Sequence, residues 1–136
     1  MNPNHFLHHN VAIVIPAFNE GKAIVDTIAG IPADFPHVIV VDDGSSDDTA
    51  ASVSRTQARL VRHPINLGQG AALQTGIDYA LLDPCIEYIV TYDADGQHRI
   101  EDVRSMLVHL QSNPVDIVLG SRFLGSAVNM PGMKRL

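Results

Sequence analysis

The feature that most constrains the fold is a set of five short, largely apolar runs, rich in β-branched residues and separated by stretches with helical periodicity. These runs occupy residues 11–16, 37–41, 59–62, 88–92 and 115–119. Apolar runs of this length, stopped by proline or by polar clusters, are typical of strands buried on both faces of a sheet. Strands that alternate with helices form βαβ units. The pattern therefore predicts an α/β fold, a Rossmann-like and mostly parallel sheet with helices on both faces.

Capping signals predict the first two helices. Asn19 is a candidate N-cap for a helix with isoleucines at positions 24, 28 and 31, and Gly30 marks its end. Ser45 and Asp48 have the spacing of a capping box, which predicts a second helix running to about Arg55.

Periodicity predicts two further helices, the first of which follows a glycine-rich turn at residues 66–70. The predicted apolar face of the third helix comprises Leu73, Ile77, Ala80 and Leu81. That of the fourth helix comprises Val103, Met106, Leu107 and Leu110.

Polar residues gather where the predicted strands end, and ligands of open parallel sheets bind outside those carboxyl ends. The residues concerned are Asn19, Glu20, Asp42, Asp43, Asp93, Asp95 and Arg122. Caps and turns account for Ser45, Asp47 and Asp48. Adjacent carboxylates repel each other and gain nothing as turn formers, so we expect Asp42 or Asp43 to bind a ligand, through hydrogen bonds from a base or a ribose.

Asp93 and Asp95 follow the fourth predicted strand within the sequence YIVTYDADGQH. In extended backbone, residues two apart face the same way, so both carboxylates are expected to point at one place. Carboxylate oxygens are hard ligands that suit Mg²⁺ or Mn²⁺, ions that usually also bind substrate phosphates. The alternative is a polar turn that only reverses the chain. His98 stands directly after this acidic loop.

Other site signatures are missing from the sequence. Gly68 and Gly70 lack the third glycine of a dinucleotide-binding fingerprint, because Leu73 stands in its place, so we interpret them as turn glycines. There is no P-loop, no G-x-S-x-G motif and no zinc spacing among the histidines.

Composition narrows the class of protein further. With 136 residues and 46% hydrophobic content the chain can bury a core, and its net charge of −6 argues against a nucleic-acid partner. No apolar run has the length of a membrane span, and the first residues lack a signal-peptide pattern. The single cysteine, Cys85, next to Pro84, is interpreted as a buried thiol in a reducing compartment. We expect a cytoplasmic domain over residues 11–136 that follows a flexible leader at residues 1–10.

Five motifs occur in order: PAFNE at 16–20, VVDDGSSDDT at 40–49, NLGQGAALQTG at 66–76, DADGQH at 93–98 and GSRF at 120–123. Together they resemble the nucleotide-sugar-binding half of family 2 glycosyltransferases, which have the GT-A fold. The DADGQH and GSRF forms are most similar to the polyprenyl-phosphate branch, typified by dolichol-phosphate mannosyltransferase. The resemblance covers about residues 10–130. It implies the N-terminal part of a GT-A fold.

The resemblance implies roles for individual residues. Pro16, Phe18 and Glu20 would line a nucleotide pocket, and Asp43 would bond the base. Arg122 would contact the phosphates or the sugar of a nucleoside diphosphate sugar.

A metal site is implied as well. Asp95, assisted by Gln97, would hold Mn²⁺ or Mg²⁺ on the diphosphate, and Asp93 would lie near the nucleotide or the metal.

The activity implied is metal-dependent transfer of a sugar, with inversion, to an acceptor such as a polyprenyl phosphate at the cytoplasmic face of a membrane.

The chain departs from the family pattern in two ways. Gln69 stands where many relatives carry a lysine in the glycine-rich turn. Family members are usually longer, and their later part supplies acceptor contacts and, in many branches, the catalytic base. We therefore expect the catalytic base to lie outside this chain. We also expect the apolar surface that the missing part would cover to favour a homodimer. The alternative is a nucleotide-sugar-binding module without turnover.

Overall fold

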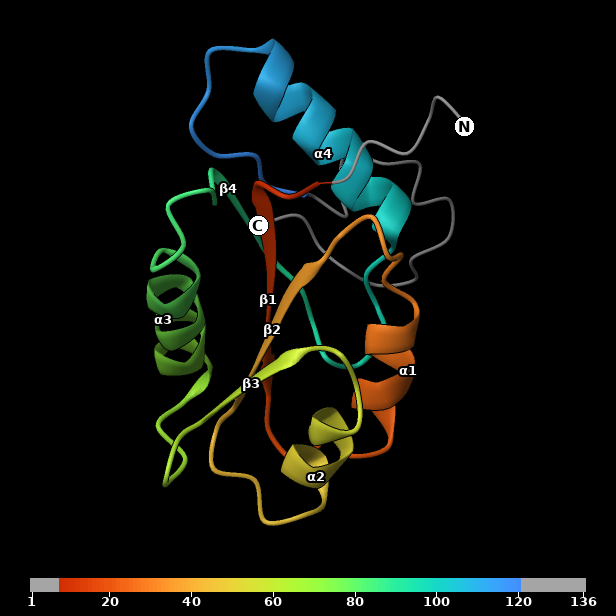
Figure 1. The fold of residues 1–136 in the computed structure, drawn as a ribbon, viewed down its shortest axis with the longest axis vertical. Helices are drawn as coiled ribbons and strands as arrows, with labels where there is room; N and C mark the ends of the chain where they lie inside the picture. Colours follow the sequence, from red (N-terminus) through yellow and green to blue (C-terminus); the bar gives the residue numbers. More distant parts are fainter. Residues whose placement is uncertain (1–7, 121–136) are drawn as a thin grey trace, which may run out of the picture. The chain divides into compact units, whose positions relative to one another are not determined.

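A four-stranded parallel sheet forms the frame of the protein (Figure 1). The structure is a computed structural model that describes residues 8–120. The strands, in sheet order, are β3 (Arg59–Arg62), β2 (His37–Asp42), β1 (Val11–Ala17) and β4 (Tyr88–Thr91). All three pairings are parallel, so the predicted Rossmann-like sheet is confirmed.

The two central strands carry the core. Residues 11–15 of β1 are fully buried, as are Val40 and Val41 of β2. In the β1–β2 register Ala17 lies opposite Asp42, so both strands end at the same edge of the sheet. That edge receives the loops that follow each strand, because parallel strands share one direction.

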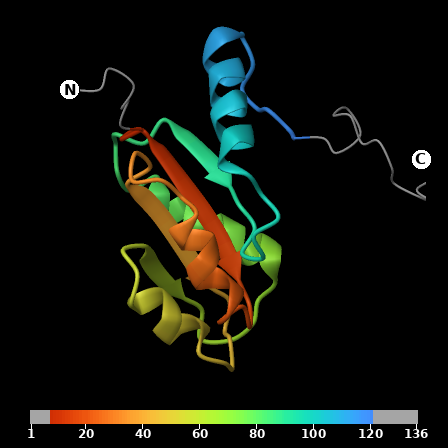
Figure 2. The same ribbon diagram turned by 90° about the vertical axis from the view of Figure 1, so that its right-hand side faces the viewer.

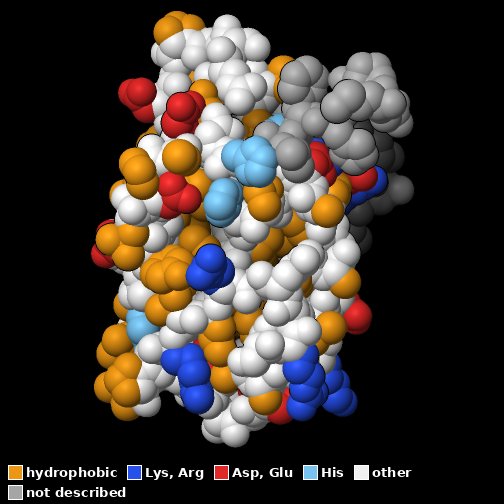
Figure 3. Space-filling view, viewed as in Figure 1, with side chains coloured by type: hydrophobic (Ala, Val, Ile, Leu, Met, Phe, Trp, Pro, Cys, Tyr) orange, Lys and Arg blue, Asp and Glu red, His pale blue; other side chains and the backbone are white. Residues whose placement is uncertain are grey.

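Helices cover both faces of the sheet, as predicted. α3 (Gln69–Ala80) lies on one face, and α1 (Ala23–Ala29) and α2 (Thr49–Ser54) lie on the other (Figures 1 and 2). On the side shown in Figure 3, the Lys and Arg side chains lie mainly toward the end of the sheet unit at which β1 finishes.

The buried face of α3 differs from the prediction. It consists of small residues, Ala72, Gly76 and Ala80, whereas Leu81 is 58% exposed. A Cβ atom on Gly76 would overlap Cγ1 of Val14 in β1. The helix thus packs so closely on the sheet that small residues form its contact face, and large apolar ones flank it.

The predicted N-caps are wrong. α1 begins at Ala23 after Lys22 rather than at Asn19, and no capping box forms between Ser45 and Asp48. The predicted end of α1 at Gly30 is confirmed.

The chain consists of two compact units, and the boundary between them along the sequence follows Ile100. In the second unit, α4 (Ile100–Ser112) has the predicted apolar face, with Val103 and Leu107 buried. The fifth predicted strand, residues 115–119, is wrong: no strand forms there, and Ile117 and Leu119 are 74% and 84% exposed. An apolar run becomes a strand only where a neighbouring strand supplies hydrogen bonds, and the described residues offer none to this run.

Two smaller findings complete the fold. Cys85 is exposed, so its predicted burial is wrong. Within residues 8–120, none of the helices combines the length and the apolar character that a membrane crossing needs.

Candidate functional site

A cavity of about 560 Å³ lies where β1, β2 and β4 end. Its lining residues come from three strand ends and from the glycine-rich turn: Pro16, Ala17, Phe18, Glu20, Asp43, Asn66, Gly68, Gln69, Asp93, Ala94 and Asp95. Six predicted site residues are therefore brought together here. They are Pro16, Phe18, Glu20, Asp43, Asp93 and Asp95. Gln97 is not part of the lining, and Arg122 lies outside the described residues.

Asn19 joins the loop after β1 to the loop after β2. Its backbone adopts a positive φ of 51°, a conformation that asparagine tolerates better than most residues. Its Oδ1 accepts hydrogen bonds from the N–H groups of Ser46 and Asp47, at 2.9 and 3.4 Å, and its own N–H donates to Oγ of Ser45. The two loops thus hold each other in place.

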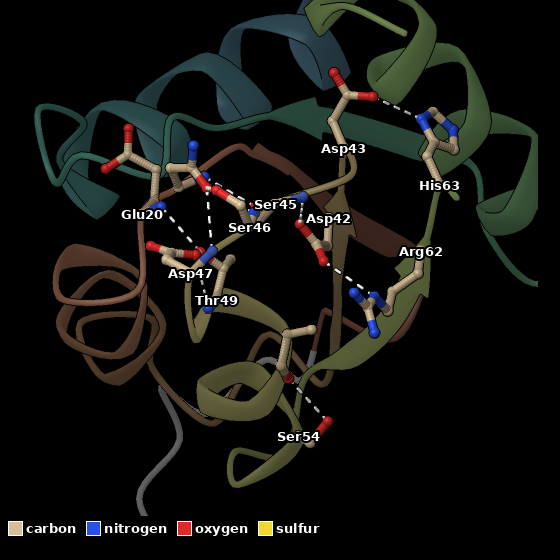
Figure 4. Close-up of polar contacts among 12 residues, drawn as sticks. Glu20, Asp42, Asp43, Ser45, Ser46, Asp47, Thr49, Ser54, Arg62 and His63 are labelled. Carbon is tan, nitrogen blue, oxygen red and sulfur yellow. Dashed lines mark hydrogen bonds and ion pairs between the residues drawn. The ribbon is translucent and has the colours of Figure 1, made fainter. Parts of the chain in front are cut away.

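Thr49 and Asp47 extend this network (Figure 4). Oγ1 of Thr49 accepts the N–H of Glu20 at 3.0 Å and donates to Oδ1 of Asp47, which also accepts the N–H of Thr49 at the start of α2. The Thr49 hydroxyl and N–H, with the N–H of Gly21, lower the pKa of Asp47 below its usual value. The carboxylate of Glu20 points away from this network and has no hydrogen-bond partner within residues 8–120.

Asp42 and Asp43 face different surroundings. Asp42 is fully buried and accepts the N–H of Ser45 at 3.0 Å and Nε of Arg62 at 3.1 Å. It does not line the cavity, so it is a structural residue. Of the adjacent pair, only Asp43 is available to a ligand there.

Asp43 is 3% exposed and accepts three hydrogen bonds. Its Oδ1 accepts from Nδ1 of His63 at 2.8 Å and from the N–H of Leu67 at 2.9 Å, and its Oδ2 accepts from the N–H of Gly68 at 2.9 Å. Burial raises the pKa of Asp43, but these hydrogen bonds and the nearby His63 outweigh it and hold the pKa below its usual value. Nε2 of His63 lies 2.8 Å from Oγ1 of Thr75 on α3.

β4 ends at Thr91 and the chain turns at Ala94 and Asp95, so no extended backbone joins Asp93 to Asp95. The alternation argument for their direction is therefore wrong, although both residues line the cavity. Oδ2 of Asp93 lies 2.9 Å from Nε2 of His98, and Oδ1 of Asp95 accepts the N–H of Gln97 at 3.1 Å. The hydroxyl of Thr27 in α1 donates to the carbonyl of Ala94 between them at 2.8 Å.

Among residues 8–120, no three His, Cys, Asp or Glu side chains come together as a metal-holding group. The chemistry of the donors nevertheless fits Mg²⁺ or Mn²⁺, because Asp93 and Asp95 offer hard oxygens to one cavity and these ions take their remaining ligands from water and substrate phosphates. Water and the phosphates of a ligand would complete the coordination.

Sequence reasoning missed four parts of the site. Asn66 and Gln69 line the cavity from the glycine-rich turn, and His63 and Thr75 support Asp43 from behind it. The missing third glycine argued against a dinucleotide fingerprint, but it carried no information on what else the turn contacts. The only signal for His63 was its place directly after a predicted strand.

The fold and the cavity define an α/β protein with a ligand site at the carboxyl ends of parallel strands. The chain belongs to glycosyl transferase family 2, whose family model matches residues 12–135.

Two relatives illustrate the match. An uncharacterised protein of Methanocaldococcus jannaschii is 38% identical over 137 residues, which cover 98% of this chain and 56% of that protein. The dodecaprenyl-phosphate galacturonate synthase of Rhizobium johnstonii is 33% identical over 82% of this chain and 36% of its own length. The resemblance to the polyprenyl-phosphate branch is thereby confirmed. The chain spans about half the length of the first relative and about a third of the second.

Among solved structures, the glucosyl-3-phosphoglycerate synthase of Mycobacterium tuberculosis, crystallised with Mn²⁺, uridine diphosphate and phosphoglyceric acid, is similar in fold. Its TM-score is 0.59 at 26% identity, over 76% of this chain and 39% of that one. The sheet unit is therefore part of a GT-A-type fold.

Proposed function

We propose that the cavity binds a nucleoside diphosphate sugar and that the chain forms the donor side of an inverting sugar transfer to a polyprenyl phosphate. The observation that carries the proposal is the convergence of Pro16, Phe18, Glu20, Asp43, Asp93 and Asp95, from three strand ends, on one cavity. The galacturonate synthase is named for a dodecaprenyl phosphate, and the glucosyl-3-phosphoglycerate synthase was crystallised with uridine diphosphate.

We assign the parts of the ligand from the carboxylates of the cavity, one of which is buried beside Phe18 while two follow β4. The base and ribose lie against Phe18 and Asp43, where one buried carboxylate can accept a hydrogen bond. The diphosphate lies toward Asp93 and Asp95. Two carboxylates repel a diphosphate unless a divalent ion lies between them, so binding depends on Mn²⁺ or Mg²⁺. Gln97 assists Asp95, and Arg122 contacts the phosphates or the sugar.

When bound, the divalent ion supplies neutralisation of the diphosphate leaving group. Asp93 and Asp95 would hold this ion, and we place the acceptor at the opposite face of the sugar. Attack from that face inverts the anomeric centre. The oxygen of a phosphate acceptor is already anionic, so this chain needs no general base for the step. A polyprenyl chain is embedded in a lipid bilayer, so the proposed reaction takes place at the cytoplasmic face of a membrane.

Isothermal titration calorimetry with UDP, GDP, CDP and ADP, each with Mn²⁺ or with excess EDTA, tests the donor assignment. We expect one nucleotide to bind in Mn²⁺ and to lose on the order of 1–4 kcal/mol of binding free energy in EDTA, the range for unscreened like charges at a protein surface. Asp95→Ala should bind equally in both buffers, whereas Asp78→Ala, on the exposed side of α3, should keep the metal dependence. Equal wild-type affinity in Mn²⁺ and EDTA contradicts the metal assignment.

Turnover separates the transferase from a binding module, since this chain covers only part of its relatives' length. Release of free nucleoside diphosphate in the presence of a polyprenyl phosphate supports transfer. Tight binding without release supports the module. Light scattering of the same sample tests the expected homodimer.

A further inference from the structure

We propose that His63 and Thr75 are positioning residues of the nucleotide site. They hold the carboxylate of Asp43 so that the protein fills three of its acceptor positions and leaves one for a hydrogen-bond donor of the base. The inference rests on the proposed function and names the part of this chain that sets its base selectivity.

His63 is fixed between three elements. It follows β3 directly, its N–H donates to the carbonyl of Asp42 at 2.9 Å, and its side chain is 9% exposed. The ring joins Asp43, at the end of β2, to Thr75 in α3, at 2.8 Å on each side (Figure 4 shows the Asp43 contact).

The proton arrangement follows from the chemistry of the partners. An ionised carboxylate only accepts hydrogen bonds, so Nδ1 of His63 carries the proton toward Asp43. In the neutral ring, Nε2 then accepts the hydroxyl proton of Thr75. Thr75 thereby favours the tautomer that donates to Asp43.

The same carboxylate positions the glycine-rich turn. Leu67 and Gly68 donate their N–H groups to Asp43, and the turn carries Asn66 and Gln69 to the wall of the cavity. Without His63, the carboxylate is held only by the N–H groups of Leu67 and Gly68, which belong to the turn itself. It can then rotate together with the turn, and the turn loses its link to β3 and α3. A histidine that merely filled the core would need no link to this wall.

The arrangement has a consequence for selectivity. A carboxylate offers about four lone-pair sites, and the protein uses three on Asp43, two of them at Oδ1. The remaining site, on Oδ2, takes an N–H or O–H donor. Uracil and guanine present a ring N–H, whereas the corresponding ring nitrogens of cytosine and adenine are acceptors, and the N–H donors of these two bases are the neighbouring exocyclic amino groups. A carboxylate held opposite the ring nitrogen therefore selects uracil and guanine. A rotating Asp43 can also reach an amino group and selects less.

The experiment measures the affinities of UDP, GDP and CDP in Mn²⁺ for the full chain and four variants. His63→Leu removes the donor, His63→Asn keeps a side-chain N–H near the place of Nδ1, and Thr75→Val removes only the hydroxyl. Thr56→Val is the matched control, because its hydroxyl donates to Val53 at the end of α2, away from the cavity.

We expect the wild type to prefer UDP or GDP over CDP by about tenfold or more, the size of one well-placed hydrogen bond to a charged group. His63→Leu should weaken the preferred nucleotide about tenfold and bring the ratio to CDP close to one. His63→Asn should recover most of the ratio, Thr75→Val should lie between, and Thr56→Val should match the wild type.

The outcomes separate the two proposals. If His63→Leu and Thr75→Val bind the nucleotides as tightly as the wild type, with an unchanged ratio of the preferred nucleotide to CDP, the proposed function stands and the positioning role is overturned. An equal loss for all nucleotides with no recovery in His63→Asn also overturns it, because that is the result of a structural defect. If no nucleoside diphosphate binds the wild type, the proposed function fails together with the inference. Thr75→Val, a near-isosteric change, decides the question if His63→Leu does not fold.

Discussion

Two regions of the cavity are built in different ways. In the base-side wall (Asp43, Gly44, His63 and residues 66–68), the central carboxylate is 3% exposed and accepts three hydrogen bonds. In the acidic turn (residues 93–98), Asp95 is exposed and accepts one, from the N–H of Gln97. Both regions follow a parallel strand at the same edge of the sheet.

The difference corresponds to the two halves of the proposed ligand. A buried carboxylate with several donors is already in place before a base arrives, so little ordering remains to be done on binding. Exposed carboxylates with few donors keep their lone pairs available for a cation. Within residues 8–120, the carboxylate of Asp93 has one hydrogen-bond partner that a cation would replace, Nε2 of His98. The side chain of His98 is 45% exposed, so it can move away.

The largest effect is expected from placing alanine at one positive-φ glycine of each region, Gly44 in the base-side wall and Gly96 in the acidic turn. Gly44 has a φ of 70°, and a Cβ there would overlap the backbone of Ile65 and Asn66, so strain and overpacking together should cost about 2–5 kcal/mol of unfolding free energy. Gly96 has a φ of 76°, but its nearest neighbour would be Oγ1 of Thr27 at 3.7 Å, so Gly96→Ala should cost only about 1–2 kcal/mol. Urea denaturation measures both.

The matched control is Gly70→Ala in α3, where a Cβ meets no atom within 4 Å and φ is not positive. It should leave stability unchanged or raise it by up to about 1 kcal/mol. Equal costs at Gly44 and Gly96 would contradict the distinction between the two regions.

The second prediction removes one carboxylate from each region. Asp43→Ala leaves His63 and two backbone N–H groups without their acceptor and should lower the unfolding free energy by about 1–3 kcal/mol. Asp95→Ala should change it by less than about 0.5 kcal/mol. Both variants should weaken nucleotide binding in Mn²⁺, so affinity in that buffer does not distinguish them, whereas stability does. A destabilised Asp95→Ala, or unchanged nucleotide affinity in Asp43→Ala, would show that the assignment of the walls is wrong.

The sheet was predictable because its information is local. Buried parallel strands appear in the sequence as continuous apolar runs, and the helices between them appear as periodic apolar patterns. The positions of the strands and the presence of helices on both faces of the sheet therefore follow from the sequence. The exception, residues 115–119, has the same local pattern as β1 but lacks a neighbouring strand in the described part of the chain. Pairing is not visible in the run itself.

The side-chain network was harder to predict because its partners are far apart in the sequence. Asn19 and Ser45 have the composition of caps, but their hydrogen bonds join loops 26 residues apart. Asp43 and His63 are separated by 20 residues and meet only because β2 and β3 are neighbours. Motif resemblance predicted ligand roles for six residues that line the cavity, and it gave no role to His63 or Thr75, which hold Asp43.

The third prediction uses pH to test the base-side wall. The folded protein lowers the pKa of Asp43, so the ionised form is favoured in the fold, and its contribution to stability is present above the unfolded value of about 3.9. That contribution is lost as pH falls through the lowered folded value, by about 1.4 kcal/mol for each unit of pKa difference. Urea denaturation between pH 6 and pH 2.5 should show a steeper loss for the wild type than for Asp43→Asn. The fold lowers the pKa of Asp47 as well, so Asp47→Asn is measured under the same conditions as a control. If stability falls equally steeply with pH in the wild type and in Asp43→Asn, Asp43 does not contribute to the pH dependence.

The smallest effect concerns the single side-chain anchor that α1 provides to the acidic turn. Thr27 is 6% exposed and donates its hydroxyl to the carbonyl of Ala94, between Asp93 and Asp95. Thr27→Val keeps the shape and leaves that carbonyl without this donor, so the unfolding free energy should fall by about 1 kcal/mol. Thr27→Ser keeps the hydroxyl and loses a buried methyl group, at a similar cost of about 1 kcal/mol. The two variants should therefore be equally stable, but only Thr27→Val should weaken Mn²⁺ binding, measured by titrating Mn²⁺ into the nucleotide-saturated protein. If both variants bind Mn²⁺ as the wild type does, the acidic turn is positioned by its ligand and not by α1, and the contrast with the base-side wall becomes sharper.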